Sequence, residues 1–258
     1  MEITIRDVHD IRGMKTIEDL QKEVWGVEDL DVVPHTQLAA ALEVGGCVIG
    51  AFVGAEMVGF VYGFLGLEHD RLVMHSHMAA VKPAYRSYGV GYRLKLAQRD
   101  RALARGITRI TWTYDPLQAL NAHFNFNKLG VVSDRYLIDF YGEATSSFLH
   151  QLGTDRLLAS WRLDRPRLAP QPPKTALLSS QEDGRPYLQE VRGALNQESV
   201  SIQIPQDIGR LQEQDIDLAR EWRTGTRSAF TQALAAGFTV LSFNRETSSY
   251  ALVRSTND

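Results

Sequence analysis

Hydrophobic and polar positions along the first 163 residues alternate between the two-residue period of strands and the four-residue steps of helices. Strands are predicted over residues 2–9, 47–53, 57–65, 71–81, 107–115, 134–142 and 155–163. Helices are predicted over residues 11–26, 35–46, 91–106 and 116–130, with Asp10 as a cap of the first and a glycine at the end of each. This order predicts an α/β (α+β) fold in which helices flank a mixed sheet.

One apolar segment, residues 47–67, is about as long as a membrane span. It contains five glycines and a central Glu56, which disfavour a single helix facing lipid. Two apolar runs separated by the turn-like Gly54, Ala55 and Glu56 are typical of strands buried on both faces. The sequence therefore predicts a hairpin here and no membrane partner.

The chain is long enough for two domains. Residues 164–174 hold four of its nine prolines, which is typical of an extended connector. We expect a first domain over residues 1–165, a proline-rich linker over 166–179 and a smaller C-terminal α+β domain over 180–258. The C-terminal domain is predicted to contain strands over 185–192 and 199–205, a long helix over 207–236 and a hairpin over 238–255.

Charge and cysteine content narrow the classes of function. The 28 lysines and arginines against 31 aspartates and glutamates give a formal net charge of −3, which disfavours nucleic acid as a partner. The single cysteine, Cys47, excludes an internal disulfide and lies in an apolar run, which favours a core thiol over a nucleophile. The N-terminus lacks the basic and apolar regions of a signal peptide, so we expect a cytoplasmic protein.

The segment between the strand over 71–81 and the helix over 91–106 carries the strongest chemical signal. A glycine-containing turn at the start of a helix leaves backbone N–H groups free, and the helix dipole there favours an anion. Gly89 and Gly91 would let a phosphate approach the main chain. In the helix that follows, the expected buried face holds Val90, Leu94, Ala97 and Ala104. Taken alone, this pattern leaves an ordinary strand-to-helix turn as an alternative.

In context, residues 79–106, with the loop RSYGVG, resemble the fourth strand, loop and helix of the GNAT superfamily of acyl-CoA-dependent N-acyltransferases. Residues 107–115 and 121–130 resemble two further stretches of that family. The resemblance implies a V-splayed sheet with acetyl-CoA as co-substrate between the separating strands. It assigns the cofactor contacts to Ala80, Val81, Arg86, Ser87, Tyr88, Gly89, Val90 and Gly91.

N-acyl transfer requires a base for the amine proton. His75 and His77 are two residues apart on a strand and therefore point to one face, and an ordinary imidazole pKa near 6.5 suits this role. The pair resembles that of arylalkylamine N-acetyltransferases. The alternative is two hydrogen-bonded core histidines. A metal site would need a third ligand, and none of His9, His35, His69, His123 and His150 has a companion spacing, so no metal is expected.

The sequence departs from the family pattern at the residue that serves as the acid. Counting back from Gly130, the tyrosine usual in the family falls on Phe126, which has no proton to give. Tyr136 and Tyr141 are candidate replacements, each with the alternative of a packing aromatic. Asn121 is assigned to the cofactor site, with a solvated helix residue as the alternative. Tyr114 and Asp115 lie where an acceptor would approach, although Asp115 equally suits a helix cap.

These features predict an enzyme that transfers an acyl group, most simply acetyl, from acyl-CoA to a primary amine of a small molecule or amino acid in one ternary complex. The alternative is a non-catalytic acyl-CoA-binding module, which Phe126 favours. Arg220, Arg223 and Arg227 on the C-terminal helix either bind an anion or pair with Asp217 and Glu221. We expect this helix to close one side of the acceptor site or to form a homodimer contact.

Overall fold

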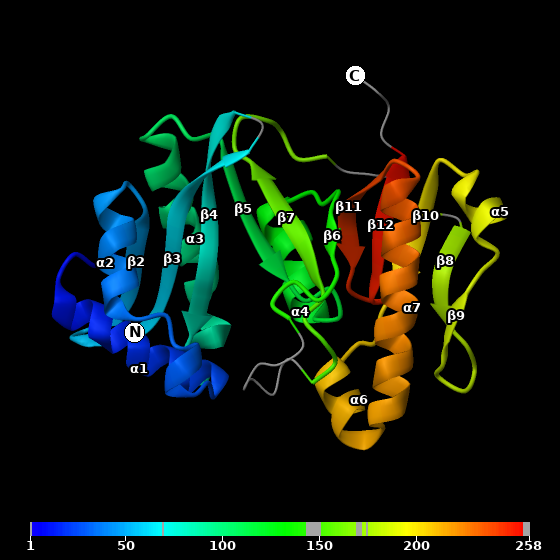
Figure 1. Ribbon diagram of the computed structural model, residues 1–258, viewed down its shortest axis with the longest axis horizontal. Helices are drawn as coiled ribbons and strands as arrows, with labels where there is room; N and C mark the ends of the chain where they lie inside the picture. The colour runs from blue at the N-terminus through cyan, green and yellow to red at the C-terminus, as the bar shows by residue number, and fades with distance from the viewer. Residues whose placement is uncertain (1, 69, 143–150, 169–171, 174, 255–258) are drawn as a thin grey trace. The chain divides into compact units, whose positions relative to one another are not determined.

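The computed structural model describes residues 2–68, 70–142, 151–168, 172–173 and 175–254. Its contacts divide the chain into two compact units, one centred on residues 2–112 and the other on residues 113–142, 152–161 and the described chain after 166. The two units are coloured blue to green and green to red along the chain in Figure 1.

The strands are β1 (Thr4–Asp7), β2 (Cys47–Val53), β3 (Glu56–Glu68), β4 (Arg71–Val81), β5 (Arg109–Tyr114), β6 (Tyr136–Leu137), β7 (Arg156–Arg162), β8 (Thr175–Ser180), β9 (Pro186–Leu188), β10 (Ser199–Gln203), β11 (Phe238–Asn244) and β12 (Ser249–Arg254). The α-helices are α1 (Ile11–Trp25), α2 (His35–Glu43), α3 (Val90–Leu103), α4 (Ala119–Ala122), α5 (Val191–Leu195), α6 (Ile208–Gln214) and α7 (Ile216–Ala235). Two 3-10 helices, η1 (Asp29–Asp31) and η2 (Pro83–Tyr88), and a π-helix, η3 (His123–Leu129), complete the description.

The first unit is built on strands β1 to β5, which lie side by side in chain order. The pairings from β1 to β4 are antiparallel, and β4 pairs with β5 in parallel. Helices α1 and α2 pack on one face of this sheet and α3 on the other, as Figure 1 shows. The apolar segment over 47–67 forms the predicted hairpin of β2 and β3. Among the described residues, no helix is both long and apolar enough to cross a membrane.

The core of the first unit lies between the sheet and helices α1 and α2. Its fully buried members come from both layers and include Met14, Ile17, Leu38, Phe60 and Tyr62. The start of α1 is fixed as the sequence predicted, because the Asp10 carboxylate accepts a hydrogen bond from the backbone N–H of Gly13 at 2.8 Å. Gly26 ends the helix with a φ of +63°, a left-handed conformation that glycine adopts without strain.

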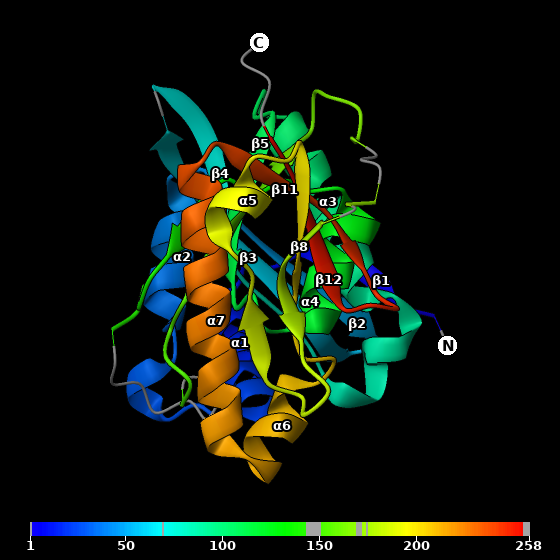
Figure 2. The same ribbon diagram turned by 90° about the vertical axis from the view of Figure 1, so that its right-hand side faces the viewer.

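The second unit contains β6 paired antiparallel with β7, and a five-stranded sheet in the order β11-β12-β10-β8-β9. In this sheet β10 pairs with β8 in parallel and the other pairs are antiparallel, so it is mixed as well. Helix α7 lies along the sheet, which is clearest in Figure 2. The structure thus confirms the predicted class, a mixed α+β fold with helices flanking the sheets.

Several elements differ from the sequence predictions. The long helix expected over 207–236 is broken at Asp215, which has extended backbone angles and accepts a hydrogen bond from the N–H of Leu218 as the cap of α7. The strand expected over 185–192 is reduced to β9, because residues 191–195 are helical. The strand expected over 134–142 is reduced to the two residues of β6.

Two predicted helices also differ in detail. The helix expected over 116–130 starts at Ala119 and continues as the π-helix η3. Helix α3 buries Val90 and Leu94 as predicted, but its buried face continues through Lys95, Gln98 and Ala102, and Ala104 is exposed. Steps of four residues from Val90 to Leu94, Gln98 and Ala102 explain this face, and they bring polar side chains into the interior.

The compact units do not follow the boundary expected from the prolines. Residues 113–142 belong to the same unit as the C-terminal elements, and β8 begins inside the expected linker over 166–179. The division into a domain over 1–165 and a C-terminal domain over 180–258 stays a prediction about function, since compactness alone does not delimit functional domains.

Candidate functional site

The loop between β4 and α3 has the conformation that an anion-binding helix start requires. Residues 83–88 form the 3-10 helix η2, and Gly89 follows with a φ of +69°. No side chain caps α3, so no side-chain acceptor occupies its N-terminus. A Cβ atom built on Gly89 would have no neighbour within 4 Å, which leaves open space beside the backbone. A phosphate group therefore fits this helix start.

Ion pairs hold the loop in place from its first residue. The Lys82 ammonium lies 2.9 Å from Glu56 and 3.1 Å from Glu23, and its backbone N–H donates to the carbonyl of Val58. Arg86 donates through Nε to the carbonyl of Val81 at 3.2 Å. Arg86, Ser87, Tyr88 and Gly89 are exposed, Gly91 is half-buried and Val90 is buried. The loop residues assigned by the resemblance thus form one continuous, mostly exposed segment. The contacts of Lys82 and Arg86 hold the start of this segment in place.

Strands β4 and β5 pair over a very short stretch. Between the described residues of these two strands there are only two parallel pairs, Met74 with Ile110 and His75 with Thr111. The remainder of β4, from Ser76 to Val81, has no partner from β5, which is what a V-splayed sheet requires. Backbone groups at this edge are able to pair with the amides of an extended ligand.

Ala80 and Val81 lie at the end of this edge, directly before the loop. Ala80 pairs with Phe60 and is buried, and Val81 pairs with Gly59 and is half-buried. A Cβ atom on Gly59 would stand 2.8 Å from the Ala80 carbonyl, so glycine permits the close approach of the two strands here. The Ala80 side chain belongs to the core, and a ligand would meet this residue through its backbone.

The histidine pair lies on the same strand, on the face that helices α1 and α2 cover. The rings of His75 and His77 have centroids 6.2 Å apart, and each ring contacts Phe64 at 5.3 and 5.7 Å, respectively. The Nδ1 of His75 is 3.2 Å from the Oγ1 of Thr111, within hydrogen-bond distance. The sequence thus placed both histidines correctly on one face, and it missed Thr111 and Phe64, which lie on neighbouring strands.

Burial changes the acidity of this pair. It lowers the pKa of His75 to about 4, with smaller contributions from the charges of His77 and Lys95. It also lowers the pKa of His77. The sequence-based expectation of an ordinary pKa near 6.5 is therefore wrong, because the half-buried site removes water that would stabilise the imidazolium. Both rings are neutral at pH 7 and each has a nitrogen that is able to accept a proton.

The remaining assigned cofactor residues belong to the second unit. Phe126 is fully buried in η3 and packs edge-on against Tyr250, at 5.8 Å between ring centroids. Asn121 is exposed on α4. Their assignment to a cofactor site stays a prediction. The burial of Phe126 gives it a packing role in this unit, one that the sequence could not reveal because Tyr250 lies 124 positions further along the chain.

The candidate acceptor residues Tyr114 and Asp115 and the candidate acids Tyr136 and Tyr141 each have another partner inside the second unit. The Tyr114 hydroxyl lies 3.3 Å from that of Tyr250, and burial raises the pKa of Tyr114 far above its ordinary range. Tyr136 donates to Asp155 at 2.6 Å. Asp115 accepts a hydrogen bond from the N–H of Leu117 but does not cap a helix as the alternative predicted, because α4 begins only at Ala119, after Gln118. Tyr141 is exposed, with its hydroxyl 3.2 Å from Thr113.

The three arginines of α7 have separate partners. Arg220 is exposed and pairs with Asp217 at 2.9 Å, as the surface alternative predicted. Arg223 pairs with Asp115, and Arg227 pairs with Asp139 and Asp155. The two inner arginines therefore connect α7 to residues 115–155, and the anion-binding alternative finds no support in these contacts.

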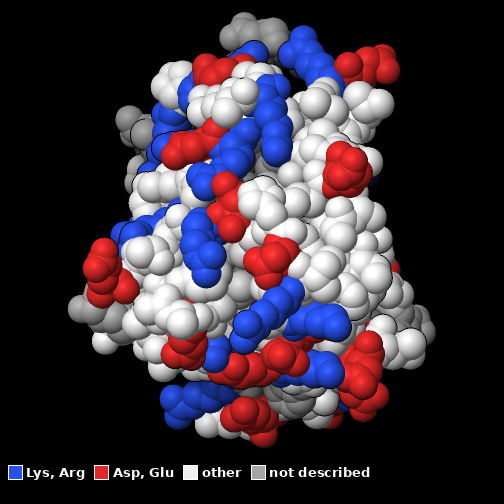
Figure 3. Space-filling view, turned by 90° about the vertical axis from the view of Figure 1, so that its left-hand side faces the viewer, with Lys and Arg blue, Asp and Glu red and all other residues white. Residues whose placement is uncertain are grey.

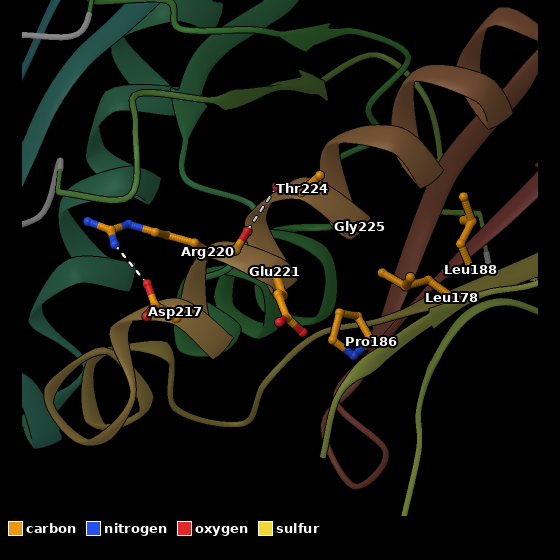
Figure 4. Close-up of a pocket in the computed structure, with 8 residues that line it drawn as sticks. All are labelled: Leu178, Pro186, Leu188, Asp217, Arg220, Glu221, Thr224 and Gly225. Carbon is orange, nitrogen blue, oxygen red and sulfur yellow. Dashed lines mark hydrogen bonds and ion pairs between the residues drawn. The ribbon is translucent and has the colours of Figure 1, made fainter. Parts of the chain in front are cut away.

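An open hollow in the second unit lies between α7 and the edge of the five-stranded sheet (Figure 4). It is lined by Leu178, Pro186, Leu188, Asp217, Arg220, Glu221, Thr224 and Gly225. Gly225 permits the close approach of the helix, because a Cβ atom there would lie 3.3 Å from both Leu178 and Pro186. The charged side chains of its rim are already paired, Arg220 with Asp217 and Glu221 with Arg185.

The distribution of surface charge and the grouping of possible metal ligands bear on the nucleic-acid and metal-binding alternatives. Lysine and arginine side chains are interspersed with aspartate and glutamate on the face drawn in Figure 3, without a large area of one sign. Among the described residues, no group of three or more His, Cys, Asp or Glu side chains could hold a metal ion. His69 and His150 lie outside the described residues.

Comparisons with known proteins agree with this geometry. Residues 13–130 match the family model described as "Acetyltransferase (GNAT) family". A search of curated proteins found no match. Among solved structures, the ribosomal-protein-S18-alanine N-acetyltransferase from Escherichia coli is similar in fold, with a TM-score of 0.51 and 13% sequence identity over 64% of this chain and 96% of that chain.

Two further solved structures have comparable similarity. A putative acetyltransferase of the GNAT family from Desulfovibrio desulfuricans gives a TM-score of 0.51 and 12% identity over 63% of this chain and 99% of that chain. Aminoglycoside 6'-acetyltransferase type Ii gives a TM-score of 0.50 and 18% identity over 64% of this chain and 100% of that chain. At these identities the likeness concerns the fold.

Proposed function

We propose, on the basis of the match of residues 13–130 to the GNAT acetyltransferase family model, that this protein transfers an acetyl group from acetyl-CoA to the primary amine of a small molecule or amino acid, by direct attack in a ternary complex. Acetyl-CoA supplies the acetyl group as an activated thioester. Residues 86–91 would hold its pyrophosphate, and the edge of β4 at Ala80 and Val81 would hold its pantetheine.

The observation that carries this proposal is the continuity of β4 from the histidine pair to the phosphate-binding loop. One strand presents two neutral imidazoles, then an edge without a partner from β5, and then a helix start with no side-chain cap. These are the three functions that an acyltransferase site needs: a proton acceptor, a binding edge for an extended chain and an anion site.

His75 and His77 would serve as the proton acceptors. The amine nitrogen must lose a proton as it forms the new amide bond, and an imidazole accepts a proton only in its neutral form. The low pKa of His75 keeps it neutral throughout the physiological range. The same low pKa favours rapid release of the proton to water, so the pair would relay the proton rather than store it.

The bond that breaks is the one between the acetyl carbonyl carbon and the sulfur of CoA. Phe126 has no proton for the departing thiolate, so in this proposal the thiolate takes its proton from water. A non-catalytic acyl-CoA-binding module is the second candidate function. The buried side chain of Phe126, which has no proton to donate, favours the module, and the histidine pair on β4 favours the enzyme.

The test is a panel of amines with acetyl-CoA, in which free CoA thiol is followed over time and the acetylated product is identified by mass. The panel should include aromatic and aliphatic amines, free amino acids and a peptide with a free N-terminal alanine, because the similar folds include enzymes named for a ribosomal protein alanine and for an aminoglycoside. Acetyl-CoA without amine is the control for hydrolysis.

Amine-dependent thiol release with a matching product would support the enzyme. Binding of acetyl-CoA by calorimetry with no product from any amine would favour the non-catalytic module. Absence of acetyl-CoA binding would overturn both candidate functions.

A further inference from the structure

A lysine is buried on the opposite face of β4 from the histidine pair. Lys95 lies on α3 and is 4% exposed. Its ammonium donates to the Oγ of Ser76 at 2.9 Å and to the Oε1 of Gln98 at 3.1 Å. It also lies 3.6 Å from the centre of the Trp112 ring, a cation–π contact from β5.

The surroundings of Lys95 are unusual for a buried cation. The contacts of its ammonium with the described residues include no carboxylate, although a buried charge is normally compensated by an opposite one. Burial lowers the pKa of Lys95 to about 7. An apolar side chain at position 95 would satisfy packing without the cost of burying an ammonium among neutral groups. We therefore look for a role of Lys95 beyond packing.

The partner of Lys95 on β4 connects it to the histidines. Ser76 stands between His75 and His77 in the sequence and points to the opposite face of the strand. The pairing of β4 with β3 is irregular at this point, because Tyr62 pairs with Met78 and Phe64 pairs with His75. Two residues of β4 therefore lie opposite one residue of β3, which is a β-bulge. The Lys95 ammonium is anchored directly behind it.

We propose that Lys95 is a positioning residue for the histidine pair: its hydrogen bond to Ser76 fixes the β4 bulge that sets the directions of His75 and His77, and its positive charge acts on His75 from the opposite face of the strand, in addition to the larger effect of burial. The inference rests on the proposed function only in naming His75 and His77 as proton acceptors. The link between Lys95 and His75 is a property of the fold and is measurable without a substrate.

The charged and titratable groups around the two residues are few. Lys95 faces Cys47 on β2 and Ser76 on β4, together with Gln98 on its own helix and Trp112 on β5. His75 faces His77, Phe64 and Thr111. Burial raises the pKa of the Cys47 thiol, so Cys47 is neutral at pH 7. The Lys95 ammonium is thus the positive charge in the interior that acts on His75 from across the strand, and repulsion between like charges disfavours the imidazolium.

The experiment is a pH titration of the histidine side chains by NMR in the full-length protein, with the His75 signal assigned from His75→Gln. Lys95→Met removes the charge and retains an unbranched chain of similar length. Arg99→Met is the matched control, because it removes a positive charge from a half-buried position of the same helix, where the side chain pairs with Asp100. We expect the His75 midpoint to move to higher pH in Lys95→Met and to remain unchanged in Arg99→Met.

A second variant separates the anchor from the charge. Ser76→Ala removes the hydrogen-bond acceptor and leaves the Lys95 ammonium in place. We expect it to keep the low His75 midpoint while lowering kcat without changing the KM for acetyl-CoA. Circular dichroism would reveal whether Lys95→Met is folded. If it is not, Ser76→Ala still tests the inference. In that case an unchanged kcat in Ser76→Ala would overturn the positioning role.

The outcomes distinguish this inference from the proposed function. A His75 midpoint that is equal in the parent and in folded Lys95→Met would overturn the inference, whatever the activity. A parent protein that produces no acetylated amine would overturn the proposed function, while the His75 titration would still report the effect of Lys95. A higher midpoint in Lys95→Met together with a lower kcat in Ser76→Ala would support both parts of the inference.

Discussion

The Nη2 atom of Arg223 lies 2.8 Å from each carboxylate oxygen of Asp115. Both side chains are almost fully buried, and the Nε of Arg223 donates to the carbonyl of Leu152. Helix α7 is thereby joined to the segment directly after β5. The C-terminal elements therefore complete the interior of the second unit and do not merely follow it in the chain.

Removing Arg223 should destabilise the protein strongly, because Asp115 would be left as a buried, unpaired charge. For Arg223→Met we expect the free energy of unfolding to fall by about 3–5 kcal/mol. Arg220→Met is the matched control on the same helix, and its exposed pair with Asp217 should contribute less than about 1 kcal/mol. Urea unfolding of both variants measures the difference. Equal losses would contradict the role given to the buried pair.

Truncation after Arg167 should unfold part of the remaining chain. It removes Tyr250, which packs on Phe126 and donates a hydrogen bond to the Pro116 carbonyl at 2.6 Å, together with the arginines that pair with Asp115 and Asp155. We expect amide hydrogens in residues 113–130 to lose protection while those in β2 and β3 retain it. Hydrogen exchange followed by mass spectrometry is the measurement. Full protection of residues 113–130 in the truncated protein would show that the C-terminal elements are an independent module.

The proposed phosphate-binding role of the loop between β4 and α3 can be tested with two glycines of nearly equal conformation. Gly89 and Gly106 have φ values of +69° and +71°, and a Cβ atom on either would meet nothing within 4 Å. Valine at each position therefore introduces similar backbone strain. In Gly89→Val, loss of a backbone contact to phosphate should weaken acetyl-CoA binding by about 1.5–3 kcal/mol, or roughly 10- to 150-fold. Gly106→Val should bind with parental affinity in calorimetry.

If Gly89→Val and Gly106→Val are both folded and bind acetyl-CoA equally, the loop does not hold the pyrophosphate. Equal weakening in both would indicate a general effect of strain on α3, which begins beside one glycine and ends near the other.

The elements that the sequence predicted well are those defined by local patterns. The hairpin of β2 and β3, the cap at Asp10 and the loop with Gly89 each depend on residues close together in the chain, where turn chemistry and periodicity decide the structure. The shared face of His75 and His77 is equally local, because alternate residues of a strand point the same way.

The features that escaped prediction depend on partners distant in sequence. The pKa of His75 is lowered by burial under other elements, the role of Phe126 depends on Tyr250, and the buried place of Lys95 depends on which face of α3 meets the sheet. A charged residue next to Leu94 gave no local signal of burial, since lysine on a helix is ordinarily exposed. Asp215 interrupts a continuous helical pattern because its side chain caps the next helix. Hydrophobic periodicity does not reveal such a break, since it takes no account of the hydrogen bond from a backbone N–H to the Asp215 side chain.

The histidine pair provides the most direct test of the proposed chemistry. In His75→Gln/His77→Gln, kcat with the best amine of the panel should fall by about 10²–10⁴, the usual contribution of general acid–base groups, while acetyl-CoA affinity is unchanged. His9→Gln, at an exposed position, is the control and should leave kcat unaltered.

The measurement that decides is kcat as a function of pH in the parent and in this double variant. Because the pKa of His75 is lowered to about 4, parental kcat should stay level as pH falls through 6.5 and decline only near pH 4, where the imidazole becomes protonated and is no longer able to accept the amine proton. The double variant should lack that decline. The same kcat and the same pH profile in the parent and the double variant would contradict proton transfer through His75 and His77.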